Sequence, residues 1–382
     1  AGTGQHADLP LMGEGSNIIP TVADKVGLNL HNRNDHPLQI IKSWIAHHFS
    51  TAHADKDGEP LFTSVDSLSP VVSTTQCFDD LLTPSDHVSR SRNDTYYVNE
   101  HHVLRSHMTA HQTTLLREGL RRFLFTGDVY RRDAVDACHY FCFHQMDGVR
   151  VFSWEELGVT CHEEAVQQVM TDLKTTLTGM VAAIFGKVQM RWVESYFPFT
   201  DPSLELEIFF NNEWLEVLGC GVMRQKILQN GGLNQHTGWA FGLGLERLAM
   251  VLFDVPDIRL FWSNDERFTS QFTKADTSPG GPKQIKFVPF SKYPICYKDV
   301  SFWHPDDFHE NNLSEIVRGI AGDLVEDVKM VSSFTHPKTG RSSRCYRLSY
   351  RSMERTLTNE EVDGMQDSIV KQMKSELGVE LR

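Results

Sequence analysis

The sequence has few cysteines, no long hydrophobic run and no excess of positive charge. Its 382 residues include seven cysteines with no Cys-x-x-Cys pair, which indicates free thiols in a reducing compartment rather than a disulfide framework. No run of about 18 apolar residues occurs, so we expect no membrane-spanning helix. The formal net charge of −13 argues against a protein that coats nucleic acid through bulk charge, although it allows a local basic surface.

The chain does have the composition of an ordinary folded protein, with 40% hydrophobic and 23% charged residues. Its length predicts two or three domains. Residues 1–30 lack a period and are predicted to form an N-terminal extension, and the absence of a secretory signal pattern fits a processed start at Ala1. The polar stretch 269–288, with Pro-Gly-Gly-Pro at its centre, is predicted to be a linker between domains at 31–268 and 289–382.

Hydrophobic periodicity predicts an α+β fold. Consecutive strand patterns, two of them joined by an Asn211-Asn212 turn, indicate an antiparallel sheet with helices beside it. The expected helices of the first domain cover 37–49, 109–125, 162–185 and 245–253, and the expected strands cover 129–132, 140–145, 204–210 and 214–218.

The C-terminal domain is predicted to have a ferredoxin-like βαββαβ order. Its elements are expected at 297–303, 313–321, 324–334, 343–351, 359–375 and 377–381. Between Lys338 and Arg355, six basic residues accompany one acid, Glu354. Arg347 and Arg351 share one strand face, which fits contact with a phosphate backbone. The alternative is a solvated edge strand protected by charge.

Two groups of residues resemble metal or nucleotide motifs only in part. His107 and His111 have zinc-ligand spacing without the Glu of HExxH, and no second pair completes the Cys/His cluster at 138–144. Gly242 and Gly244 are followed by Arg247 where a dinucleotide-binding loop needs a third glycine. Structural zinc and a Rossmann fold are therefore not favoured.

The stretch 127–149 has stronger chemical content. Arg131 ends a strand that would otherwise be buried, and a charge there requires an ionic partner or a function. His139, Phe143, Gln145 and Asp147 are predicted to share one face of the returning strand, and they offer an imidazole, a ring, an amide and a carboxylate. The alternative is a surface hairpin with mixed polar residues.

This stretch resembles motif 2 of class II aminoacyl-tRNA synthetases. Residues 36–45 (HPLQIIKSWI) resemble motif 1, and residues 241–253 (FGLGLERLAMVLF) resemble motif 3, with Arg247 as its arginine. Residues 145–147, 195–200 (SYFPFT) and 239–247 (WAFGLGLER) are similar to phenylalanine–tRNA ligases. The C-terminal pattern resembles the anticodon-binding domain of the single-chain mitochondrial members.

The resemblance implies ATP-dependent attachment of phenylalanine to tRNA(Phe) through a phenylalanyl-adenylate, with ATP and Mg²⁺ as cofactors. It also implies the mitochondrial matrix as location and a monomer with no large editing subunit and no membrane contact. Asp133 stands where relatives often have Glu, and its reach is one methylene shorter. The catalytic residues implied are Arg131, His139 and Arg247.

The resemblance assigns further residues to each substrate. Arg131 would bridge the α-phosphate and the carboxylate, and Phe143 and Arg247 would enclose adenine. Glu216 would hold Mg²⁺, and Arg347 and Arg351 would contact tRNA. The other implied ATP-binding residues are Asp133, Cys138, His139, Tyr140 and Gly242. The implied phenylalanine-binding residues are His107, Thr109, Ala110, His111, Gln112, Gln145, Met146, Asp147, Phe197, Phe199, Ala240 and Phe241.

Three alternatives remain open at this point. A class II ligase for another amino acid is opposed by Phe197, Phe199 and the small Ala240, which suit an aromatic ring. A non-enzymatic tRNA-binding relative is opposed by the retention of Arg131 and Arg247, because an inactive site has no need of buried charge. An unrelated acyl-adenylating ligase, such as a biotin ligase, needs no C-terminal domain of this kind.

Overall fold

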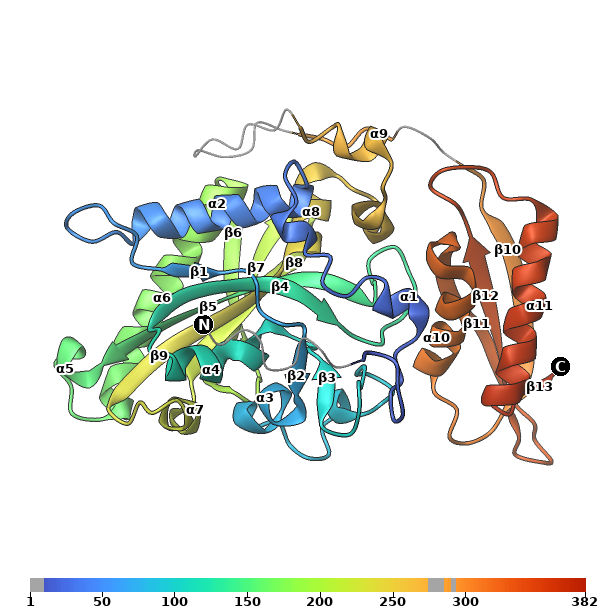
Figure 1. Cartoon of the computed structure of the whole chain (residues 1–382), viewed down its shortest axis with the longest axis horizontal. Coiled ribbons are helices and arrows are strands. Elements are labelled where there is room, and N and C mark those ends of the chain that lie inside the picture. Colours follow the sequence, from blue (N-terminus) through green and yellow to red (C-terminus); the bar gives the residue numbers. More distant parts are fainter. Residues whose placement is uncertain (1–9, 274–284, 290–292) are drawn as a thin grey trace.

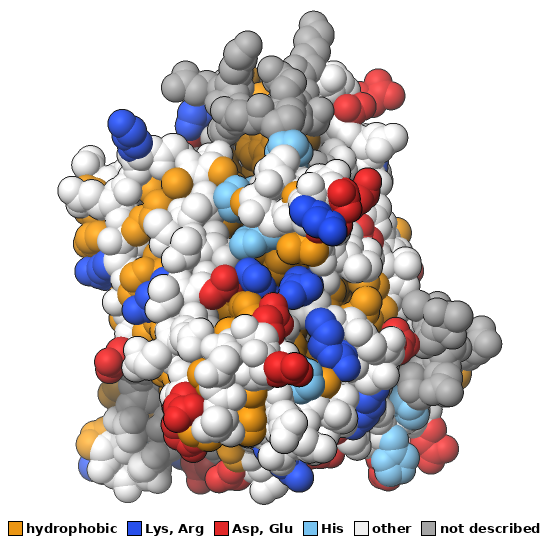
Figure 2. Space-filling model, turned by 90° about the vertical axis from the view of Figure 1, so that its left-hand side faces the viewer, with side chains coloured by type: hydrophobic (Ala, Val, Ile, Leu, Met, Phe, Trp, Pro, Cys, Tyr) orange, Lys and Arg blue, Asp and Glu red, His pale blue; other side chains and the backbone are white. Residues whose placement is uncertain are grey.

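A computed structural model describes residues 10–273, 285–289 and 293–382. The chain forms a large sheet flanked by helices and a separate four-stranded sheet at the C-terminal end (Figure 1). On the face of the first domain turned away from the C-terminal domain, basic and acidic side chains are interspersed (Figure 2). Within the described residues, no helix is long and apolar enough to cross a bilayer.

The first domain is built on a seven-stranded sheet with the order β1-β4-β5-β9-β8-β7-β6. All neighbouring strands are antiparallel except β1, which pairs parallel to β4. The predicted antiparallel sheet is thus confirmed apart from this edge. The strands are β1 Thr63–Val65, β4 Arg122–Tyr130, β5 Cys142–Ser153, β6 Gln189–Ser195, β7 Thr200–Phe210, β8 Glu213–Met223 and β9 His236–Gly244; a two-stranded sheet pairs β2 Val71–Ser73 with β3 His102–Leu104.

Three long helices cover one face of this sheet: α2 Pro37–Ala52, α6 His162–Phe185 and α8 Leu245–Phe253 (Figure 1). Pro37 starts α2, where its missing N–H costs nothing. Ile41, Ile45 and Phe49 then recur on one side and are fully buried. These helices agree with the predicted ones because their apolar stripes repeat over several turns.

The shorter elements connect these layers. The helices are α1 Pro20–Ala23, α3 Thr74–Cys77, α4 Gln112–Arg117, α5 Trp154–Leu157, α7 Gln225–Asn230 and α9 Glu266–Thr269, and the 3₁₀ turns are η1 Leu30–Asn32, η2 Asp79–Leu81, η3 Val88–Arg90, η4 Met108–His111, η5 Ile258–Trp262 and η6 Gly322–Leu324.

The helix predicted over 109–125 is wrong. The chain forms η4 and α4, turns at Gly119, whose φ is +96°, and enters β4 at Arg122. Phe123 and Leu124 mimic a helical stripe, but they lie on opposite faces of a strand that is buried on both sides. The Thr109 hydroxyl does not cap a helix here and bonds the distant carboxylate of Asp147.

The β7–β8 hairpin agrees with the prediction, whereas the β4–β5 hairpin differs from it in length. The β7–β8 hairpin is confirmed, with Asn211 and Asn212 at φ of 50° and 69° in its turn, the conformation that two-residue hairpins need. The β4–β5 pair is longer than predicted, and its connecting loop covers residues 131–141. His139 therefore lies in the loop and does not share a strand face with Phe143 and Asp147, as was predicted.

The C-terminal domain has the predicted βαββαβ order. Its elements are β10 Cys296–His304, α10 Glu310–Ala321, β11 Val325–Thr335, β12 Ser342–Tyr350, α11 Asn359–Glu376 and β13 Glu380–Leu381. The sheet order is β11-β12-β10-β13. Tyr346, Leu348 and Tyr350 face the helices and are buried, whereas Arg347 is exposed.

The C-terminal domain contacts the loop 131–141 of the first domain. Arg318 donates from Nη2 to the carbonyl of Asp133 at 2.9 Å, and the Val328 N–H donates to the carbonyl of Val135 at 2.9 Å. The predicted linker lies mostly at 274–284, outside the described residues, and Phe272, before that gap, is buried in the first domain's core. The predicted domain boundaries remain a prediction.

Candidate active site

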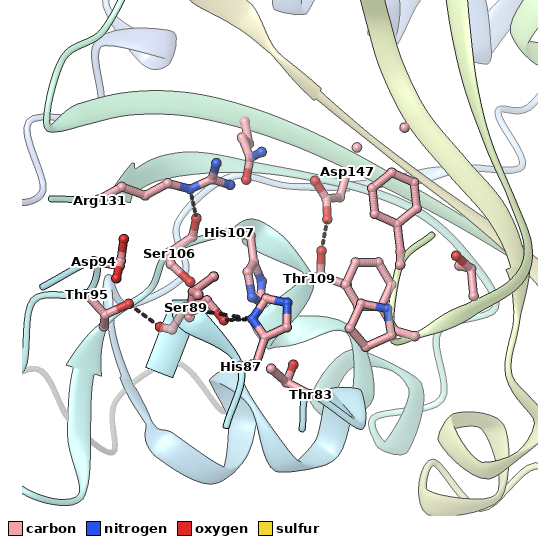
Figure 3. Close-up of a pocket in the computed structure, with 18 of the residues that line it drawn as sticks. Thr83, His87, Ser89, Asp94, Thr95, Ser106, His107, Thr109, Arg131 and Asp147 are labelled. Carbon is pink, nitrogen blue, oxygen red and sulfur yellow. Dashed lines mark hydrogen bonds between the residues drawn. The ribbon is translucent and has the colours of Figure 1, made fainter. Parts of the chain in front are cut away.

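A cavity of about 540 Å³ opens where β5, β8 and β9 meet the segment after β4 and the segments before α4 and β7 (Figure 3). Two-thirds of the residues predicted to bind phenylalanine lie on its wall, together with four of those predicted to bind ATP. The predicted residues that line it are His107, Thr109, Arg131, Asp133, Gln145, Asp147, Phe197, Phe199, Glu216, Ala240, Phe241 and Gly242.

Asp147 is a carboxylate on the wall of this cavity. Its side chain is buried and accepts a hydrogen bond from Thr109 Oγ1 at 2.6 Å. Burial raises the pKa of Asp147 from 3.8 to about 7, although Thr109 and Arg131 both act to lower it. A cationic ligand group would hold this carboxylate in its charged form.

Arg131 supplies the positive charge of the cavity. Its Nε donates to the carbonyl of Ser106 at 2.8 Å, and its guanidinium lies 5.1 Å from the ring centre of Phe143. Burial lowers the pKa of Arg131, while Asp133 and Asp147 raise it. Figure 3 shows Arg131 and Asp147 along the same wall of the cavity, so one ligand can meet both charges.

An aromatic wall lies beside the two charges. The rings of Phe197 and Phe199 stack at 5.9 Å with an interplanar angle of 13°, and His107 lies 6.4 Å from Phe199. A Cβ at Gly219 would come within 2.7 Å of the Phe197 ring, so glycine allows this close approach. Burial lowers the pKa of His107 to about 3, which leaves its imidazole neutral at pH 7.

A buried ion pair lies next to the turn η4. Arg105 and Asp128 are each 1% exposed and meet at 2.7 Å. Arg105 Nη1 also donates to His111 Nε2 at 3.0 Å. His111, predicted to contact phenylalanine, therefore holds the turn η4 in place from behind.

Glu246 ties β5 to the start of α8. It accepts a hydrogen bond from the His144 N–H at 2.8 Å and meets His144 Nδ1 at 2.7 Å, and both side chains are at most 3% exposed. His144 precedes Gln145 on β5, and Glu246 precedes Arg247 on α8. The pair thereby fixes the predicted adenine-binding arginine relative to the cavity.

We expect Glu246→Ala to raise the KM for ATP roughly 10- to 100-fold, because small displacements of binding groups have effects of this size. The KM for phenylalanine should change much less, since Asp147 and Thr109 do not touch Glu246. Glu246→Gln keeps an acceptor for the His144 N–H and should retain most of the function. Equal increases in both KM values would contradict the positioning role; pyrophosphate exchange measures both.

Nine predicted residues are not brought to the cavity wall. Met146 points to the opposite face of β5 because strand side chains alternate. His139 bonds Asp136 at 2.7 Å, which raises the pKa of His139. Arg247 lies just beyond the wall, 3.4 Å from Glu216. The others are Ala110, His111, Gln112, Cys138, Tyr140 and Phe143.

No metal cluster accompanies these residues. In the described ranges, no group of three or more His, Cys, Asp or Glu side chains has the geometry to hold a metal ion. Glu216 is the one predicted metal ligand, and it lines the cavity with 45% of its side chain exposed.

Comparison with known proteins identifies the family to which this chain belongs. Residues 61–272 match the family described as "tRNA synthetases class II core domain (F)", and residues 291–382 match the "Ferredoxin-fold anticodon binding domain". The chain is 54% identical over 367 residues to the chloroplastic/mitochondrial phenylalanine–tRNA ligase of Arabidopsis thaliana, covering 96% of this chain and 83% of that one. The chain belongs to the phenylalanine–tRNA ligases, a family of class II aminoacyl-tRNA synthetases.

Two other relatives cover different shares of this chain. The mitochondrial ligase of Mus musculus is 49% identical, with 96% of this chain and 86% of that one covered. The ligase alpha subunit of Thermosynechococcus vestitus is 40% identical over 199 residues, which is 51% of this chain and 55% of that one. The mouse and Arabidopsis matches, each covering 96% of this chain, are thus to ligases whose names include the mitochondrion.

Several residues of the ligase cavity were missed from the sequence. Ser106 holds Arg131, Cys220 lies beside the aromatic wall, and Asn311 comes from the C-terminal domain. Tyr196 adjoins the predicted Phe197 but was not singled out. None of these residues stands in a spacing that signals a site, and Asn311 is brought there only by domain packing.

The arginines of the basic stretch 338–355 in the anticodon-binding domain pair with acids on other elements. Arg347 makes two hydrogen bonds to Asp299 at 2.8 Å each, and Arg351 donates from Nη2 to Glu326 at 2.8 Å. The count of six basic residues and one acid between Lys338 and Arg355 is correct along the chain, but it does not include acids on adjacent strands that pair with these arginines.

Proposed function

We propose that this cavity is where the chain activates phenylalanine and transfers it to tRNA, for protein synthesis in the mitochondrion. As a member of its family, the chain attaches phenylalanine to tRNA at the expense of ATP. The observation that carries the residue assignment is the joint placement of Asp147, Arg131 and the Phe197/Phe199 wall in one cavity. These groups match the ammonium, carboxylate and ring of the amino acid.

In the first step, a carboxylate oxygen of phenylalanine attacks the α-phosphorus of ATP, and pyrophosphate leaves. The carboxylate is already ionised at pH 7, so the step needs orientation and charge stabilisation more than a base. Asp147 and Gln145 would hold the ammonium group. Arg131 would bind the carboxylate and the α-phosphate together and stabilise the charge that develops there.

Mg²⁺ binding requires little from this protein. Enzymes of this kind hold the ion through substrate phosphates and one or two carboxylates. Glu216, exposed on the cavity wall near Arg247, is a carboxylate that fits this need. When bound, the ion neutralises charge on the leaving pyrophosphate.

In the second step a ribose hydroxyl at the tRNA 3′ end attacks the carbonyl carbon, and AMP leaves.

We expect the cavity to reject tyrosine only modestly. Ala240, Phe241 and Cys220 are apolar or neutral, and the Thr200 hydroxyl is already paired with Ser203 at 2.7 Å. A pocket with no free partner for a hydroxyl discriminates by about 10²-fold. The kcat/KM for tyrosine in pyrophosphate exchange should lie about 10²- to 10³-fold below that for phenylalanine. A ratio above about 10⁵ would contradict this pocket.

We assign part of the tRNA contact to Arg347 and Arg351. Arg347 lies on the exposed face of β12 and 5.7 Å from the ring of Tyr297, and Arg351 directly follows the end of that strand with its side chain partly exposed. The double variant R347A/R351A should raise the KM for tRNA in phenylalanine charging while pyrophosphate exchange stays unchanged. Each lost phosphate contact should also reduce the salt dependence of tRNA binding by about one unit of slope. Equal loss in both assays would remove this assignment.

We also propose a cellular location and an oligomeric state for the protein. The relatives that cover 96% of this chain have names that include the mitochondrion, which supports the mitochondrion and, more specifically, the matrix as the place of action. A single chain that carries both the catalytic core and the anticodon-binding domain supports a monomer without an editing subunit. Size-exclusion chromatography with light scattering would test the monomer.

A further inference from the structure

The buried side chain of Ser203 in β7 makes three hydrogen bonds to residues of the cavity wall. Its Oγ donates to the Thr200 carbonyl at 3.0 Å, lies 2.7 Å from Thr200 Oγ1 and accepts from the Phe197 N–H at 3.3 Å. A hydroxyl has one hydrogen to donate and two lone pairs to accept with. Since the Ser203 hydrogen goes to the carbonyl, the Thr200 hydroxyl is the donor of the 2.7 Å bond. Ser203 thereby spends its whole hydrogen-bonding capacity on Phe197 and Thr200, which both line the cavity.

These bonds hold a segment that the sheet itself holds poorly. The Thr200 N–H donates to the Phe197 carbonyl at 3.3 Å, which closes a turn, and the register of β7 against β8 shifts between Thr200 and Ser203. Such a shift interrupts the regular ladder of backbone hydrogen bonds. The Ser203 hydroxyl reaches back over the interruption to residues three and six positions earlier. The place of the aromatic wall therefore depends on this one side chain.

Phe197 and Thr200 lie against two glycines of β8. A Cβ at Gly219 would come within 2.7 Å of the Phe197 ring, and a Cβ at Gly221 would come within 2.7 Å of Thr200 Cβ and 2.9 Å of Thr200 Oγ1. Gly221 pairs with Ala240 of β9, and directly paired residues are neighbours on one face of a sheet. The Thr200 hydroxyl therefore lies in the part of the cavity that Ala240 lines.

The proposed ammonium site lies further along the same face of β9. A Cβ at Gly242 would come within 2.8 Å of the Asp147 carboxylate. Gly242 and Ala240 are two residues apart, so they share a face and are separated by roughly 7 Å along the strand. A phenylalanine with its ammonium group at Asp147 and its ring beside Phe197 would direct the para position of the ring toward Ala240 and Thr200. Tyrosine carries its hydroxyl at this position.

We propose that Ser203 is a positioning residue that sets the preference of the pocket for phenylalanine over tyrosine. Because Ser203 accepts the Thr200 hydrogen, the ring of phenylalanine meets a threonine whose hydrogen is already bonded. Without Ser203, the Thr200 hydroxyl would be unpaired beside phenylalanine and free to bond the hydroxyl of tyrosine. A site with a free polar group favours the substrate that pairs with it and disfavours the analogue that does not. Ser203 acts through Thr200 and Phe197 and is not itself on the cavity wall.

This inference rests on the proposed binding of phenylalanine, which pyrophosphate exchange by the unaltered chain tests by itself. We expect Ser203→Ala to raise the KM for phenylalanine roughly tenfold, with little change in kcat or in the KM for ATP, because the wall is displaced and the phosphate contacts are not. The ratio of kcat/KM for phenylalanine to that for tyrosine should fall about three- to tenfold, the effect of one neutral hydrogen bond. This ratio is independent of the folded fraction of a preparation, since both amino acids are measured with the same protein.

Three further variants separate the hydroxyl pair from a general loosening of β7. The double variant T200V/S203A also removes the unpaired hydroxyl, so its ratio should return at least to that of the unaltered chain. Ser203→Cys keeps the shape but bonds more weakly, and it should lower the ratio by less than Ser203→Ala. The matched control is Ser195, which pairs with Ser203 across the sheet but donates to Glu205 at 2.8 Å; Ser195→Ala should leave the ratio unchanged.

The outcomes distinguish this inference from the proposed function. If the unaltered chain activates phenylalanine but neither Ser203→Ala nor Ser203→Cys changes the ratio, the role of Ser203 in specificity is overturned while the proposed function stands. A lowered ratio that persists in T200V/S203A would also overturn it, because the Thr200 hydroxyl would not be the cause. A lowered ratio in Ser203→Ala that T200V/S203A restores and Ser195→Ala does not reproduce is the expected result.

Discussion

Replacing Asp147 with Asn should lower kcat/KM for phenylalanine in pyrophosphate exchange by roughly 30- to 3,000-fold. Removing one partner of a buried charge pair costs about 2–5 kcal/mol, and each 1.4 kcal/mol is a factor of ten. Asn is nearly isosteric and keeps an acceptor for Thr109 Oγ1, which lies 2.6 Å from the carboxylate. The loss in kcat/KM would therefore come from the missing negative charge and not from a changed side-chain shape.

The matched control is Asp147→Glu, which keeps the charge. We expect it to retain activity within about tenfold of the unaltered chain, because a displaced charge still attracts the ammonium group. The pH dependence provides a second control. Since burial raises the pKa of Asp147 to about 7, kcat/KM should rise as pH increases through this value, and Asp147→Asn should remove the step.

Asp147→Asn should also stabilise the fold at high pH. The folded pKa of Asp147 is about 7 and its ordinary value is 3.8, so the folded chain holds a proton that the unfolded chain releases. Stability contributed by the neutral carboxyl is present below about pH 4 and is lost as pH rises to about 7. At pH 8, Asp147→Asn should raise the free energy of unfolding by up to about 4 kcal/mol. If Asp147→Asn raised the free energy of unfolding by the same amount at pH 4, the buried charge of Asp147 would not be the cause of the stabilisation.

Arg131→Ala should reduce the rate of adenylate formation by roughly 10³-fold, the range typical of arginines that stabilise a phosphoryl-transfer transition state. Arg131→Lys should recover part of this loss, because lysine keeps the charge but not the planar fork that binds two groups at once. A burst assay of pyrophosphate release measures the step directly.

Arg122 offers a control on the same strand. It begins β4, whereas Arg131 directly follows the end of that strand, and it pairs with Glu156 at 3.2 Å near the surface. Arg122→Ala should change adenylate formation by less than about threefold, as expected for a surface ion pair. If Arg131→Ala lost no more activity than this control, Arg131 would have no role in the chemistry.

The sequence predicts the layout of this protein better than the details of its site. Long apolar stripes such as those of α2 and α6 repeat over several turns, so their helices could be read directly. The segment 109–125 could not be read, because a short strand buried on both faces has the same apolar residues as a helix. Side-chain alternation also placed Gln145 and Asp147 correctly on one face of β5.

The rest of the site depends on contacts between distant segments. The pairing of Glu246 with His144, and that of Arg347 with Asp299, join residues 102 and 48 positions apart. No local pattern signals such partners. Tyr196 is similar, since an aromatic residue next to Phe197 could be core or surface until the fold exposes it. Asn311 reaches the cavity only through contact between the two domains.

The central claim is that this cavity activates phenylalanine. Its most direct test is ATP–pyrophosphate exchange, without tRNA, against each of the twenty amino acids. Asp147, Arg131 and the Phe197/Phe199 wall predict exchange led by phenylalanine, with tyrosine a distant second. Exchange led by another amino acid would contradict the pocket assignment, and no exchange with any amino acid would contradict the catalytic assignment altogether.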